Sequence, residues 1–217
     1  MKSTLIPLLG LLALTTALPS PSSSNRCAAT GATGAISITA SQISSVAPKS
    51  SSCDGADFPE ECATADQAAK ALSSAFTKYK LSSKSEQAAV LGLIAMESGE
   101  FRYNKNHFPG VEGQGTRNMQ SPDFNKLYAA SIESLADRFE AVKDQPGAVL
   151  DLLLEDSSVD FGSGAWFLTT QCEDSVREGL KSGSEDGWKG FITGCVGTEA
   201  NDQRKSYWQK AVEALGK

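Results

Sequence analysis

The sequence has few of the side chains that hold metals and redox centres. Its 217 residues include one histidine, His107, and five cysteines, of which no two form a C-x-x-C pair. Zinc sites in proteins use several closely spaced His, Cys or carboxylate ligands. The sequence therefore indicates no bound metal, and it implies no organic cofactor.

Long apolar runs are also scarce. The longest covers residues 5–14, follows Lys2 and precedes a small-residue cleavage pattern. Such a run is too short to span a bilayer and is typical of a secretory signal. We therefore expect a secreted, extracellular protein with a signal peptide at 1–17, a Ser/Pro/Gly-rich arm or pro-segment at 18–35, and one domain at 36–217.

Positive charge is not in excess. Lys and Arg total 20 against 26 Asp and Glu, so the net charge is −6 and the pI is about 4.9. Surfaces that bind nucleic acid or anionic membranes are usually basic. The composition therefore predicts neither nucleic acid nor a membrane as a partner, and we expect a monomer.

The cysteines predict disulfides, because an exported chain folds in an oxidising compartment. Cys53 and Cys62 would close a short loop, and Cys172 and Cys195 bracket two helical segments. We favour these two bridges, although the sequence alone permits other pairings. Cys27 is then the odd thiol.

One helix carries the main candidate for chemistry. The capping-box pattern Ser83-x-x-Glu86 predicts a helix that begins near Lys84, and Gly99 is placed to end it. Glu97 lies in the last turn, on the face of the apolar residues, where the helix opens into a polar loop. A carboxyl group at such a place is a candidate general acid, and an ion pair with Arg102 or Arg117 is the structural alternative.

The rest of the chain predicts a mainly α, single-domain fold. No stretch shows sustained period-two alternation, so β structure is limited to a small hairpin inside the loop at 101–120. Further helices are expected at 64–79, from Pro122, at 132–142, from Pro146, at 163–172, 176–181 and 188–195, and at 207–215.

The segment E-S-G-E-F-R-Y-N-K-N-H-F-P-G, with G-Q-G-T-R-N-M-Q-S-P after it, resembles the lysozyme-like superfamily, which includes goose-type lysozymes and lytic transglycosylases. It is most similar to a group of secreted fungal muramidases, and the resemblance runs from Ile36 to the C-terminus. Arg117 and Asn118 depart from the Gly-Leu of the wider superfamily. The resemblance implies a lysozyme-like helical domain and a glycoside hydrolase. Its reaction would be the cleavage of β-1,4 bonds between N-acetylmuramic acid and N-acetylglucosamine in bacterial peptidoglycan, with Glu97 as general acid.

A glycosidase of this kind commonly uses a second carboxylate. Asp160 and Glu100 are the first choices, and Glu112 and Asp123 are further candidates. Asp160 precedes a glycine-rich helix start, where capping the helix is an equally good explanation.

The polar loop is dense in side chains that hydrogen-bond sugars. Ordinary turns use the same Asn and Gly residues, and a tryptophan can equally belong to the core. The expected substrate-binding residues are Tyr103, Asn104, Asn106, His107, Gln114, Thr116, Arg117, Asn118, Gln120 and Trp166.

Two other functions stay open at this stage. The first is a chitinase or chitosanase acting on a related N-acetylated polysaccharide, and the second is a non-catalytic effector that binds glycans. A serine hydrolase is disfavoured, because Ser98 lacks a G-x-S-x-G motif and the chain has a single histidine.

Overall fold

The computed structural model describes residues 36–216. The chain divides into two units, Met1–Thr33 and Gly34–Lys217, and only the second is described here. The expected signal peptide at 1–17, the arm at 18–35 and Cys27 lie outside the described residues.

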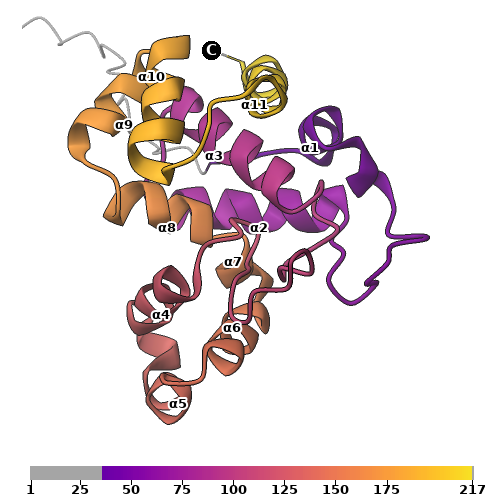
Figure 1. The fold of residues 1–217 in the computed structure, drawn as a ribbon. Helices are drawn as coiled ribbons and strands as arrows, with labels where there is room; N and C mark the ends of the chain where they lie inside the picture. The colour runs from indigo at the N-terminus through magenta and orange to yellow at the C-terminus, as the bar shows by residue number, and fades with distance from the viewer. Residues whose placement is uncertain (1–35, 217) are drawn as a thin grey trace, which may run out of the picture. The chain divides into compact units, whose positions relative to one another are not determined.

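The prediction of a mainly α domain is confirmed (Figure 1). In place of a hairpin, the loop has two isolated bridges that pair Gly115 with Lys105 and with Gln120. The helices are α1 (Ala40–Val46), η1 (Pro48–Ser51), α2 (Ala65–Lys78), α3 (Lys84–Glu97), α4 (Pro122–Ala130), η2 (Glu133–Leu135), α5 (Ala136–Val142), α6 (Pro146–Leu154), α7 (Ser157–Asp160), α8 (Ser163–Thr170), α9 (Asp174–Lys181), α10 (Glu185–Gly190), the π-helical η3 (Phe191–Val196) and α11 (Asp202–Leu215).

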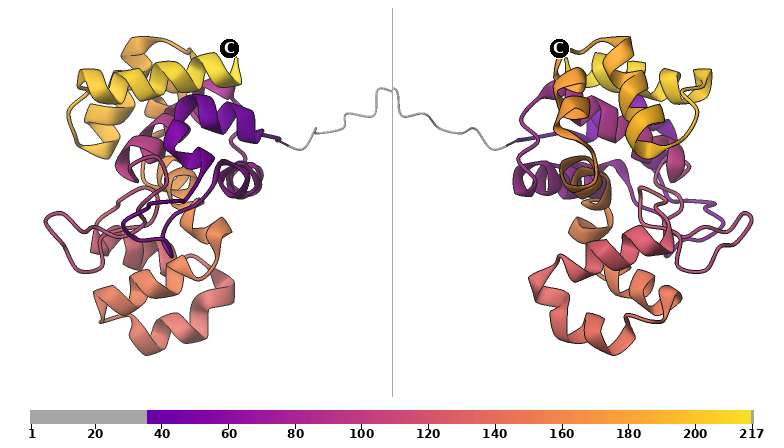
Figure 2. Two further views of the ribbon diagram at one scale, coloured as in Figure 1. Left: turned by 90° about the vertical axis from the view of Figure 1, so that its right-hand side faces the viewer. Right: turned by 60° about the vertical axis from the view of Figure 1, so that its left-hand side comes forward.

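Helix α3 is the centre of the larger of two hydrophobic clusters. Ser83 caps its N-terminus as predicted, by accepting the backbone N–H of Glu86. Every residue from 87 to 95 is buried, because α2, α8, α9 and α11 surround the helix (Figures 1 and 2). The end of α3, where Glu97 lies, therefore has a rigid support.

The second cluster joins α4, α5 and α6 to α8. Trp166 belongs to it: the side chain is 3% exposed and its ring lies 4.9 Å from that of Tyr128. Trp166 is therefore a core residue, which was the alternative to its expected role in substrate binding. Within residues 36–216, no helix has the length and apolar character needed to cross a membrane.

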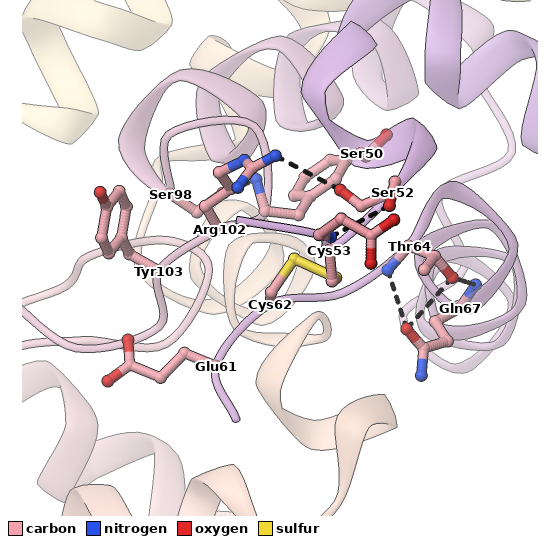
Figure 3. The surroundings of a disulfide bond; sticks show 12 residues. Ser50, Ser52, Cys53, Glu61, Cys62, Thr64, Gln67, Ser98, Arg102 and Tyr103 are labelled. Carbon is pink, nitrogen blue, oxygen red and sulfur yellow. Dashed lines mark hydrogen bonds between the residues drawn. A yellow bond between two sulfur atoms is a disulfide. The ribbon is translucent and has the colours of Figure 1, made fainter. Parts of the chain in front are cut away.

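Both predicted disulfides are present. Cys53–Cys62 closes the segment between η1 and α2, and Figure 3 shows it beside Glu61 and the loop with Arg102 and Tyr103. Cys172–Cys195 ties the residues after α8 to η3.

Candidate functional site

The loop after α3 leaves the helix through a run of left-handed residues. Gly99, Glu100 and Phe101 have φ values of 58°, 63° and 68°. Further along, a Cβ on Gly115 would lie 2.4 Å from the carbonyl oxygen of Asn104. The glycines therefore allow the loop to fold back on itself at the end of α3.

An almost wholly buried ion pair holds this loop in place. The backbone N–H of Arg117 and its Nε both donate to the carboxylate of Asp160, at 2.9 and 2.8 Å. The two residues are 3% and 2% exposed. Burial raises the pKa of Asp160, and Arg117 acts in the opposite direction.

A groove runs along the other side of the loop. It consists of two adjoining hollows of about 230 and 280 Å³ that share Glu97, Gln114 and Met119. A third hollow of about 240 Å³ continues from the first past His107. A larger cavity of about 510 Å³ lies beside Trp208 and Val212, away from the predicted site residues.

Glu97 lies where the first two hollows meet. Its side chain is 21% exposed and forms an ion pair with Arg204, which is 13% exposed and comes from the first turn of α11. The sequence suggested Arg102 or Arg117 as an ion-pair partner, whereas Arg102 donates to the carbonyl of Ser52. In this arrangement the pair presents Glu97 as a carboxylate.

Six of the ten predicted substrate-binding residues line the two hollows. They are Tyr103, Asn106, His107, Gln114, Asn118 and Gln120. Lys105, Phe108, Met119 and Arg204 line them too.

The structure places the other four predicted binding residues outside these hollows. Asn104 donates to Asp160, and the hydroxyl of Thr116 donates to the carbonyl of Gly115. Arg117 is the buried anchor of the loop, and Trp166 is in the core.

The two preferred second carboxylates also lie away from the groove. Asp160 is enclosed with Arg117. Glu100 is 7% exposed and accepts the N–H of Lys49 and the hydroxyl of Tyr207. Both carboxylates hold segments together, so the geometry does not bring a second acid from this set next to Glu97.

A carboxylate that the sequence did not indicate lies behind His107. Glu61 is 5% exposed, its Oε1 lies 2.8 Å from Nε2 of His107, and its Oε2 accepts the N–H groups of Asn104 and Lys105. The ring of Phe58 stacks on the imidazole at 3.7 Å. No local pattern predicts this pairing, because 46 residues separate Glu61 from His107.

The described residues do not form a metal centre. Among them there is no group of three or more His, Cys, Asp or Glu placed to hold a metal ion. His107 is committed to Glu61, and four cysteines form disulfides.

Comparison with known proteins gives one informative relative. No protein-family model matches the sequence, and no solved structure matches it. Over 156 residues the chain is 45% identical to a bifunctional dioxygenase (DOX)-epoxy alcohol synthase (EAS) of Fusarium oxysporum (strain Fo5176). The match covers 69% of this chain and 12% of that relative.

This relative contradicts the expectation of a muramidase that cleaves peptidoglycan. Its name describes an oxygenase and a synthase, and the chitinase, chitosanase and glycan-binding alternatives do not fit that name either. The broader expectation of an enzyme agrees with it. An acid at a helix end beside a polar loop is compatible with several chemistries, so the sequence pattern did not determine the reaction. The likeness to the lysozyme-like superfamily stays a prediction about the fold.

Proposed function

We propose that this chain is an enzyme domain whose groove holds an uncharged, oxygen-bearing organic substrate across Glu97. Glu97 exchanges a proton with the substrate or bonds to an electron-poor carbon of it. The observation that carries this proposal is the position of Glu97, which lines both hollows at their junction. A substrate that occupies both hollows passes directly over the carboxylate.

The electrostatics of the groove favour a neutral substrate. Its charged side chains are already paired, so a charged ligand would meet little unbalanced charge. The pairs are Glu97 with Arg204, His107 with Glu61, and Lys105 with Asp151. The amide N–H groups of Asn106 and the second amide N–H of Gln114 remain to bind hydroxyl, ether or carbonyl oxygens, whereas the hydroxyl of Tyr103 already donates to Asp57.

The relative supports oxygen-bearing substrates without transferring its activities to this chain. Activation of O₂ is chemistry that a cofactor carries. The donor set of the described residues does not fit a resident metal, and we derive no step through one. An epoxy alcohol, which the name of the relative mentions, belongs to the proposed substrate class.

The two disulfides support an oxidising compartment for this chemistry. Secretion to the extracellular space is accordingly part of the proposal.

The test uses glycidol, the smallest epoxy alcohol, as a covalent probe. Glu97 attacks a ring carbon, the ring C–O bond breaks, and the released oxygen takes a proton, so that an ester forms with nothing lost. Peptide mass spectrometry then gives the labelling rate of each carboxylate. We expect Glu97 to react about 10²-fold faster than exposed carboxylates, because the site also provides the proton that the released oxygen takes.

Glu178 is the matched control, because it is also ion-paired, with Lys181, but is 70% exposed. Glu97→Gln should remove the label from position 97 and leave the other sites unchanged, whereas Glu178→Gln should leave the reaction of Glu97 unchanged. A labelling rate at Glu97 equal to that at Glu178 in the folded wild-type protein would overturn the proposal.

A further inference from the structure

The loop closed by Cys53–Cys62 acts as a clamp on one wall of the groove. Three of its residues contact the polar loop, two through carboxylate hydrogen bonds and one through ring stacking. The Asp57 carboxylate accepts the hydroxyl of Tyr103 at 2.7 Å, Phe58 stacks on the imidazole of His107, and Glu61 bonds the same imidazole. The disulfide is next to Glu61, and the carboxylate of Glu61 is directed away from it (Figure 3).

Glu61 fixes the orientation of His107. A carboxylate only accepts hydrogen bonds, so Nε2 of His107 carries the proton between them. The two backbone N–H groups on Oε2 and the 5% exposure of Glu61 leave the carboxylate little freedom to move. With Nε2 committed, Nδ1 is the nitrogen that remains for a ligand.

His107 and Glu97 face one cavity. Both line the hollow of about 230 Å³, and His107 keeps 22% of its side chain exposed. A carboxylate and an imidazole on one cavity can take opposite parts in a proton transfer.

We propose that His107 is the second proton-transferring residue of the site and that Glu61 is its positioning residue. This inference rests on the proposed function of the groove. In the reaction with an epoxide, the bond from Glu97 to carbon forms as the ring C–O bond breaks. The electron pair of that bond goes to the oxygen, which takes its proton from the imidazolium of His107.

The first measurement is ¹⁵N-edited NMR of the imidazole, which is unambiguous because the chain has one histidine. We expect the proton on Nε2, as a low-field signal protected from exchange. The signal should vanish in His107→Asn and lose its low-field position in Glu61→Gln. Glu60→Gln, next to Glu61 but exposed, is the matched control and should leave the signal unchanged.

The second measurement is the rate at which glycidol labels Glu97. His107→Asn should lower it about 10²-fold, because general acid–base help is of that size. Glu61→Gln should lower it by about 10–100-fold, the range known for carboxylates that orient metal-bound imidazoles, where the same kind of hydrogen bond fixes the ring. Circular dichroism and thermal melting identify a variant that fails to fold, and Glu61→Asp then serves as the milder change, expected to keep part of the rate.

The outcomes separate the two proposals. If Glu97 of the wild type is not labelled preferentially, the proposed function fails, and the NMR measurement still tests the Glu61–His107 contact. If Glu97 is labelled but a folded His107→Asn keeps the wild-type rate, the role of His107 is overturned alone. A proton on Nδ1 without one on Nε2 would overturn the positioning role of Glu61.

Discussion

The guanidinium of Arg117 and the carboxylate of Asp160 form an ion pair whose side chains are only 4% and 3% exposed. The same guanidinium donates to the carbonyls of Glu61, Phe101 and Tyr103. One buried cation therefore joins α7, the disulfide loop and the loop after α3. Its contacts explain how irregular backbone beside the groove keeps a defined shape.

Replacing Arg117 with Met should destabilise the protein by about 3–5 kcal/mol, because Asp160 is left as an unpaired buried carboxylate. Urea unfolding followed by circular dichroism measures the loss. The double variant Arg117→Met, Asp160→Leu should recover part of it, since no charge then stays buried alone. A loss below about 1 kcal/mol in the single variant would show that the pair is not the anchor we describe.

Local chemistry made much of the fold predictable. A capping-box pattern predicted the start of α3, and proline at the first helical turn predicted the starts of α4 and α6. Short sequence separations, together with the expectation of an exported chain, predicted the disulfides. The caps depend on neighbouring residues, and the two disulfides join cysteines that are 9 and 23 residues apart, so these predictions needed no knowledge of the tertiary structure.

The site was less predictable, because its contacts are long-range. Glu97 was found from its helix-end position, but its partner Arg204 is 107 residues away. Asp160 and Trp166 have suitable side chains, and only burial shows that they lie outside the groove. Glu61 lies in the loop closed by Cys53–Cys62, directly before Cys62, where no local pattern marks it.

Gly92 allows α11 to lie close against α3. A Cβ at this position would be 2.8 Å from Cα and 2.9 Å from N of Trp208, and backbone atoms cannot move aside easily. Gly92→Ala should therefore destabilise the protein by about 1–3 kcal/mol, despite the better helix propensity of alanine.

Gly190 is the matched control for Gly92. It lies in α10, and no atom approaches a Cβ placed there within 4 Å. Gly190→Ala should be neutral or stabilising by up to about 1 kcal/mol in the same thermal melts. Equal effects of the two substitutions would show that the close approach of α11 to α3 does not require glycine at position 92.

The two disulfides should differ in what they do for the groove. Removing either with a pair of Cys→Ser changes should lower the free energy of unfolding by about 2–5 kcal/mol. Only loss of Cys53–Cys62 should also broaden or shift the imidazole NMR signal of His107, because the clamp residues lie in that loop. The Cys172–Cys195 variant is the control, and the same change in its signal would contradict the clamp.

The contact between Tyr207 and Glu100 makes the free energy of unfolding depend on pH in the alkaline range. The hydroxyl of Tyr207 donates to Glu100 at 2.7 Å. Burial, together with this hydrogen bond, raises the pKa of Tyr207 to about 12. An unfolded tyrosine ionises near pH 10, so the unfolded chain loses this proton first. The stabilisation is therefore complete below about pH 10 and is lost as the pH rises towards about 12.

Tyr207→Phe removes both the hydrogen bond and the titration. The variant should be less stable than wild type by about 1 kcal/mol near pH 8, where the hydroxyl is intact in both states. Urea unfolding at intervals from pH 8 to pH 12 should show this difference shrinking above about pH 10. The other tyrosines and the lysines titrate in both proteins, so the difference between the curves isolates Tyr207. Because this side chain keeps some contact with solvent, the change in the difference should not exceed about 1 kcal/mol. Parallel curves across that range would mean that the Tyr207–Glu100 contact does not hold the phenol in its protonated form.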